Sequence, residues 1–179
     1  MLEPELIEEF GVYVSALRLQ QVPPDWQEIA AECRSAFAET WIQVVDAAAV
    51  AGLPHVLFSA FNAVSAFRHS YNKLVQLEAA LLLVISGTDR FQKALETAGA
   101  KVGKPGVAIV MSRDRFSCTS AVEMVSSRIA NVTGISHPSP EEAKEVARLQ
   151  GLDLRSLGPA GGSVGAILAL VERGSLLYS

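Results

Sequence analysis

Three consecutive helical patterns decide the fold: LPHVLFSAFNAVSAFRH (residues 53–69), LEAALLLVISGT (77–88) and FQKALETAGA (91–100). Pro54 occupies the first-turn position that proline prefers, so a helix is expected over 53–69. A second helix is expected from Lys73 to about Ile85, with a break at Ser86-Gly87. Thr88 or Asp89 is expected to cap a third helix, which stops at Gly99. Its apolar stripe consists of Phe91, Ala94, Leu95 and Ala98.

Short β-rich or apolar runs predict strands over 10–17, 41–45 and 106–111. Further helices are expected over 25–40, 119–132, from Ser139 onward, and over 163–173. Three helices in succession between the second and third strands exclude a regular alternation of strand and helix. The sequence therefore predicts an α+β fold, a small mostly antiparallel sheet packed against several α-helices, as a single domain over residues 1–179.

Composition indicates a folded chain outside the membrane. Hydrophobic residues make up 50% and the mean hydropathy is +0.28, which suffices for a core and argues against disorder. The longest apolar run, 79–86, is far shorter than a membrane span. The acidic N-terminal stretch lacks the basic start of an export signal, so a cytoplasmic location and buried, reduced thiols at Cys33 and Cys118 are expected.

The net charge of −4 is unevenly distributed. Residues 1–67 carry −7, residues 68–104 carry +3 and residues 105–179 carry 0. A basic middle behind an acidic front is compatible with a localised anionic ligand, although a solvated charged face would look the same.

Motifs for catalysis or metal binding are incomplete. GGSVG (161–165) matches a nucleophile elbow, but no histidine follows Ser163 and a loop is expected before it. GAKVGKP (99–105) has three residues between its glycines and a proline after Lys104, unlike a phosphate-binding P-loop. The three histidines form no metal-binding pair. No catalytic residue, metal or cofactor is therefore expected.

The helix over 53–69 has an unusually wide apolar arc of roughly 220°, where a one-sided core helix needs only about 100°. The narrow polar remainder consists of His55, Ser59, Asn62 and Ser65. Such a helix is either fully buried or presents a second apolar face to a partner. After the next helix, Arg90 and Lys93 are expected on the outer face of a helix start, which suits a phosphate or an RNA end, or is an ordinary capped helix.

The order of these motifs, with the tail VERGSLL (171–177), resembles the kinase-binding accessory subunits of the KEOPS complex, the PRPK-binding protein (TPRKB) family. The resemblance spans nearly the whole chain and is strongest over 55–101. It departs from the family at the third helix, where Arg90-Phe91 replaces the usual Gln-Ile, and the glycine-rich segment 158–165 is local to this sequence.

The resemblance implies a non-catalytic, archaeal-like adaptor that binds the small atypical kinase/ATPase of the complex. It also implies recruitment of tRNA by its 3′ CCA end for threonylcarbamoyladenosine synthesis, with no small-molecule substrate. Single-stranded ends are held by cations and by aromatic or apolar platforms. The candidate tRNA-binding residues are Lys73, Thr88, Arg90, Phe91 and Lys93. The candidate kinase-interface residues are Leu57, Phe58, Phe61, Leu176 and Leu177.

A small-molecule-binding α+β domain, or a hydrolase that uses Ser163, is the alternative. It predicts a deep pocket with convergent polar groups, and activity that is lost on Ser163→Ala substitution.

Overall fold

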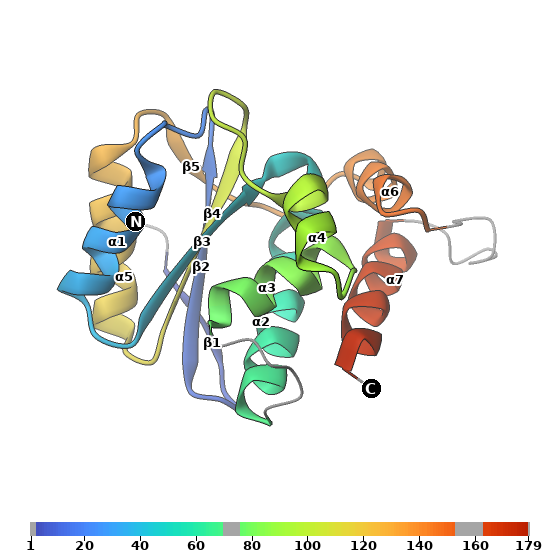
Figure 1. Ribbon diagram of the computed structural model, residues 1–179, viewed down its shortest axis with the longest axis horizontal. Coiled ribbons are helices and arrows are strands. Elements are labelled where there is room, and N and C mark those ends of the chain that lie inside the picture. Colours follow the sequence, from blue (N-terminus) through green and yellow to red (C-terminus); the bar gives the residue numbers. More distant parts are fainter. Residues whose placement is uncertain (1–2, 70–75, 153–162, 179) are drawn as a thin grey trace. The chain divides into compact units, whose positions relative to one another are not determined.

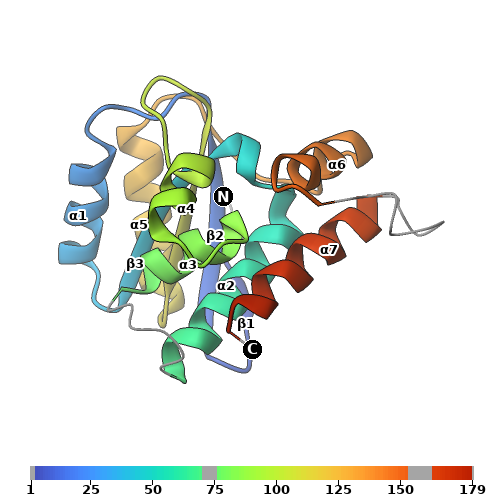
Figure 2. The same cartoon turned by 45° about the vertical axis from the view of Figure 1, so that its right-hand side comes forward.

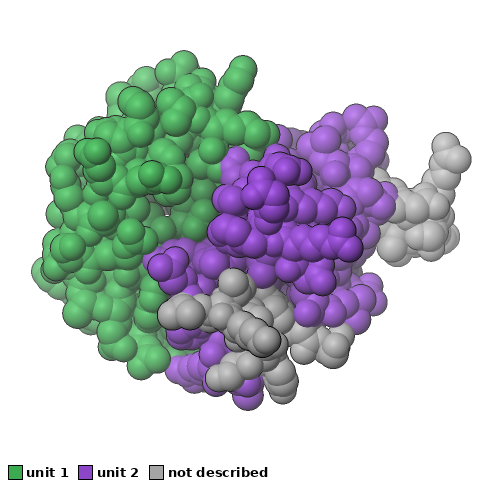
Figure 3. All heavy atoms as spheres, in the orientation of Figure 1, with its two compact units in different colours: residues 1–47, 100–135 green, residues 48–99, 136–179 purple. Residues whose placement is uncertain are grey.

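The computed structural model describes residues 3–69, 76–152 and 163–178. The chain divides into two compact units, each assembled from two stretches (Figure 3). The sheet unit comprises residues 1–47 and 100–135, and the helical unit comprises residues 48–99 and 136–179. The α+β class and the antiparallel sheet are confirmed; a single domain over the whole chain stays a prediction.

The sheet unit contains five strands, all paired antiparallel. They are β1 (Glu5–Ile7), β2 (Val12–Leu19), β3 (Thr40–Asp46), β4 (Gly106–Ser112) and β5 (Val132–Gly134). The order is β1-β2-β4-β3, and β5 pairs with the last residues of β2. β4 is therefore an inner strand, and all seven of its residues are buried.

Two helices, α1 (Trp26–Ala36) and α5 (Arg115–Arg128), pack against this sheet and against each other (Figure 1). Successive strand residues point to opposite faces, so alternate residues of β2, β3 and β4 share the face that these helices cover. Hydrophobic side chains from that face and the two helices form one core, which includes Leu17, Leu19, Ile42, Val44, Val110, Ile29 and Val122. Both cysteines, Cys33 and Cys118, are buried in it as free thiols, as expected.

The helical unit is built around α3 (Leu77–Ser86), in which every residue except Ala79 is buried. The helices α2 (Gly52–Arg68), α4 (Phe91–Ala98) and α7 (Ser163–Ser175) each contact α3. α6 (Pro140–Leu149) packs on α7, and two single turns complete the unit, η1 (Ala47–Ala49), which runs in from the sheet unit, and η3 (Leu176–Tyr178). Ser139 and Glu142 form a reciprocal capping box at the start of α6, as the serine, proline and early acids predict.

Several expected boundaries are wrong. The helix expected over 119–132 lies at Arg115–Arg128, and its N-cap is Asp114, whose carboxylate accepts the Ser117 N–H at 2.7 Å. The helix expected over 25–40 ends at Ala36. The strand expected over 10–17 is β2, which lies two residues later. The strands β1 and β5 were not predicted, since three-residue strands are too short to show alternation. In the expected helix 73–85, residues 73–75 lie outside the described ranges.

Within the described ranges, no helix is long and apolar enough to cross a membrane.

Candidate functional site

A tight turn connects α3 to α4 and positions the candidate RNA-binding residues. Gly87 ends α3 in the left-handed conformation, with φ +64°. Its N–H donates to the Val84 carbonyl at 3.1 Å, and the Thr88 N–H donates to the Leu83 carbonyl at 3.3 Å. These two bonds form a Schellman motif, which satisfies the last carbonyls of the helix. The turn therefore has a defined geometry.

The expected cap of α4 is wrong. The N-cap residue is Arg90, whose side chain makes no capping hydrogen bond. Thr88 lies two residues before this N-cap, and its Oγ1 accepts the Arg90 N–H at 3.3 Å. Thr88 is only 8% exposed, so its side chain holds the turn together and does not face solvent.

The large apolar residues of α4 do not form the expected buried stripe. Only Ala94 and Ala98 are buried, whereas Phe91 is 46% and Leu95 is 41% exposed. The helix packs on α3 through its small side chains, and this leaves the larger ones outside. As a result Phe91 is almost half exposed, and the nearby Arg90 and Lys93 are exposed as well. Lys73, the remaining candidate, lies outside the described residues.

A polar cluster that the sequence did not reveal, Arg173 and Gln150, is hydrogen-bonded to this turn. Arg173 of α7 donates from Nε to the Gly87 carbonyl at 3.0 Å and from Nη1 to the Gln150 carbonyl. Gln150 in turn donates from Nε2 to the Ile85 carbonyl at 2.6 Å. A Cβ on Gly87 would lie 2.9 Å from Arg173 Cδ, so only glycine fits beneath the guanidinium. Three helices are thus tied to the turn that precedes Arg90.

The polar remainder of α2 is partly buried. Two of its residues, His55 and Ser59, are 1% and 2% exposed. The buried face is made mostly of small side chains, Ser59, Ala60, Ala63 and Ala66, which let neighbouring helices approach closely. Asn62 and Ser65 are half-buried.

The opposite face of α2 is partly exposed and apolar, so the helix is not fully buried. Phe58 is 47% exposed, and Leu57 and Phe61 are half-buried. α7 runs alongside α2 (Figure 2). Gly174 of α7 lies closest to α3, where a Cβ on it would meet Val84 Cγ1 at 2.8 Å. The same Cβ would be at an ordinary contact distance, 3.9 Å, from Asn62 Nδ2 of α2, one helical turn from Phe58.

Leu176 and Leu177, the C-terminal candidates for the kinase interface, follow shortly after Gly174 in the sequence. Leu176 is 62% exposed and Leu177 is half-buried. The structure therefore brings the proposed kinase-contact residues onto adjacent elements, the outer face of α2 and the turn after α7. Further exposed apolar residues of this unit, which the sequence did not single out, are Leu149, Val164 and Leu168.

His55 is a core histidine. Its Nδ1 accepts the Ala51 N–H at 3.2 Å, and its Nε2 has no partner in the described part of the chain. Burial disfavours the imidazolium and lowers the pKa of His55 from 6.5 to about 4. The side chain is therefore neutral at physiological pH.

The motifs set aside from the sequence have structural explanations where they are described. The GAKVGKP turn leads into β4, whereas a P-loop leads into a helix. Ser163 begins α7, and the residues before it are outside the described ranges. Among the residues that the structure describes, no group of three or more His, Cys, Asp or Glu could hold a metal ion.

Comparison with protein-family models and with curated proteins found no match to this chain. The functional proposal therefore rests on the surfaces of the helical unit and on the resemblance in sequence.

Proposed function

We propose that the protein is a non-catalytic adaptor subunit of a KEOPS-type complex, which binds the kinase/ATPase subunit and recruits tRNA through its 3′ CCA end. The observation that carries this proposal is the exposed aromatic ring of Phe91 at the start of α4, where the cations Arg90 and Lys93 are also exposed. An aromatic platform flanked by cations suits an unpaired base and its phosphates.

The geometry of the turn supports a role in binding. Phe91 is almost half exposed, although burial of an aromatic ring favours folding. The turn before it is fixed by the Schellman motif and by the hydrogen bond from Arg173, so its residues are positioned before a ligand arrives. Preorganisation reduces the entropy that binding costs.

The protein partner would contact the apolar face formed by Leu57, Phe58 and Phe61, together with Leu176 and Leu177. Large exposed apolar side chains on adjacent elements are typical of protein–protein contacts. This surface and the Arg90–Lys93 surface belong to different segments of the same helical unit, which suits an adaptor with two ligands.

The RNA proposal is tested by measuring the affinity of tRNA with an intact and with a trimmed CCA end. The double variant Arg90→Glu, Phe91→Glu should lose at least tenfold in affinity for intact tRNA, because one base–aromatic stack contributes about 1–3 kcal/mol. Lys144→Glu, Leu149→Glu on α6 is the matched control, since it makes the same kind of change at a partly exposed cation and an exposed apolar residue of this unit. Wild-type affinity in the first variant would refute the site.

The kinase proposal is tested by a pull-down with the kinase subunit at micromolar concentration. Phe58→Asp should abolish the complex and leave folding intact, because the ring is about half exposed. Phe67→Asp, at a residue 38% exposed near the end of the same helix, is the control. Failure of the wild-type protein to bind would overturn the adaptor proposal.

A further inference from the structure

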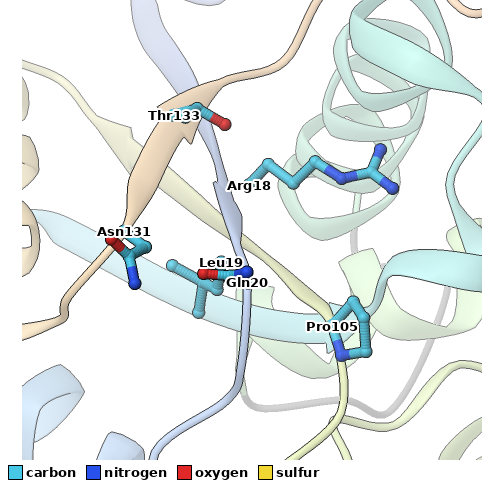
Figure 4. A pocket seen from close by; sticks show the side chains of 6 residues that line it. All are labelled: Arg18, Leu19, Gln20, Pro105, Asn131 and Thr133. Carbon is cyan, nitrogen blue, oxygen red and sulfur yellow. The ribbon is translucent and has the colours of Figure 1, made fainter.

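The sheet unit carries a groove made of two open hollows that meet. One, of about 330 Å³, is lined by Arg18, Pro105 and Thr133 among others (Figure 4). The other, of about 540 Å³, runs along Pro23 and Val102. Gln20 and Asn131 line both hollows, so the two form one continuous depression.

Backbone contacts fix the walls of this groove. Arg18 of β2 pairs directly with Thr133 of β5, so their side chains leave the same face of the sheet. After β2, the Val22 N–H donates to the Lys104 carbonyl at 2.8 Å. The Gly103 N–H donates back to the Val22 carbonyl at 2.9 Å. The turn that ends at Pro105 is thereby held against the end of β2.

The charge of the groove differs from that of the unit around it. The sheet unit has eleven acidic and seven basic residues, a net charge of −4. None of the residues that line the two hollows is acidic. A groove free of carboxylates in an acidic unit favours an anionic ligand.

Only two cations of this unit have no interaction partner for their side chains among the described residues, and one lines the groove while the other lies at its edge. Arg18 lines it, and Lys104 lies between Gly103 and Pro105, one from each hollow. Both side chains are exposed. The five others are engaged: Lys101, Arg113, Arg115 and Arg128 form ion pairs, and Arg34 has another interaction.

Arg128 also lines the groove, but its side chain is ion-paired. It binds Glu32 through two hydrogen bonds of 2.7 and 3.4 Å, so its charge is already compensated. Lys101 is likewise paired with Asp46 at 2.8 Å. The positive charge available to a ligand therefore comes from Arg18 and Lys104.

We propose that this groove binds the backbone phosphates of an RNA strand, with Arg18 and Lys104 as the phosphate-contacting residues. Two hollows that are open and continuous accommodate a chain better than an enclosed small molecule. The amides of Gln20 and Asn131 offer donors and acceptors for bases or 2′-hydroxyls, and Val102, 56% exposed, offers an apolar contact. The inference rests on the proposed function and adds a second contact to the same tRNA, away from its CCA end.

The test is the salt dependence of tRNA binding. Each phosphate contact contributes roughly 0.7–0.9 to the slope of log K against log salt. Arg18→Gln, Lys104→Gln should therefore reduce the slope by about 1.4–1.8 for intact and for CCA-trimmed tRNA alike. Arg113→Gln, Arg115→Gln, which removes two ion-paired cations of the same unit, is the control and should keep the wild-type slope. The exchange Arg18→Lys, Lys104→Arg preserves the charges and should also keep it.

The outcomes separate this inference from the proposed function. If wild-type protein prefers intact tRNA but the groove variant keeps the wild-type slope and affinity, the groove inference is wrong and the proposed function stands. If the groove variant lowers the slope while neither protein distinguishes intact from trimmed tRNA, the groove stands and the CCA proposal fails. If wild-type protein binds neither tRNA, both fall.

Discussion

Acid is expected to destabilise this protein through His55. The imidazole is 1% exposed, and Nδ1 accepts the Ala51 N–H while Nε2 has no partner among the described residues. Burial lowers its pKa from 6.5 to about 4. Between these two values the unfolded chain binds the proton more readily than the folded chain. The free energy of unfolding is therefore highest above pH 6.5 and decreases as the pH falls towards 4.

The two pKa values set the size of the effect. With 6.5 in the unfolded chain and about 4 in the folded protein, acidification from neutral pH to pH 5 removes about 2 kcal/mol from the free energy of unfolding. At pH 4 the loss is about 3 kcal/mol. Domains of this size are commonly stable by roughly 5–15 kcal/mol, so the folded state persists and the difference is measurable.

Urea unfolding at a series of pH values, compared between wild type and His55→Asn, isolates this contribution. The carbonyl oxygen of asparagine can take the place of Nδ1 as acceptor for the Ala51 N–H, and it does not titrate in this range. The variant should therefore lose about 2 kcal/mol less than wild type on going from neutral pH to pH 5. His137→Asn, at an exposed histidine of the same unit, should behave as wild type. Equal losses in wild type and His55→Asn would refute the buried, neutral state of His55.

Three further predictions concern stability and reactivity. Gly87→Ala should lower the free energy of unfolding by at least about 1–2 kcal/mol, because φ is +64° and the new methyl meets Arg173; Gly151→Ala, with φ +74° and nothing within 4 Å, should cost less in the same thermal-unfolding assay. Ser139→Ala should cost about 1 kcal/mol in urea unfolding, because it removes the capping box of α6, and an unchanged midpoint would contradict the cap. Burial raises the pKa of the Cys118 thiol to about 12, so it should react with a thiol reagent at pH 8 only as fast as the protein unfolds; immediate labelling would contradict its burial.

Local patterns in the sequence predict those elements whose signals are local. The alternating or apolar runs of β2, β3 and β4 and the Ser139-Pro140 start of α6 are all found in the structure. The start of α5 is not evident from the sequence because its first turn, after Asp114, exposes Phe116 and shows no helical stripe. The strands β1 and β5 form by pairing with β2, and the sequence of a three-residue segment does not indicate such a pairing.

The buried face of α2 could not be read from hydrophobicity. His55 and Ser59 are inside, and Phe58 is half outside, because packing distance between helices favours small side chains at the contact. The hydrogen bond that the Ala51 N–H donates to His55 Nδ1 also offsets part of the cost of burying an imidazole. Side-chain size and hydrogen bonding together, and not polarity alone, thus decide which face of this helix is core.

Some functional candidates can be predicted from neighbouring residues in the sequence, and others only from tertiary contacts. Arg90, Phe91 and Lys93 are neighbours in sequence, so their clustering was predictable, and only the exposure of Phe91 needed the structure. Whether a cation is available to a ligand depends on its tertiary neighbours. Of the seven cations in the sheet unit, the sequence gives no reason to select Arg18 and Lys104, because the ion pairs that neutralise others join residues far apart, such as Arg128 with Glu32. A surface of negative net charge can therefore contain a site for an anion, and the pattern of ion pairing, more than the sum of charges, shows where it lies.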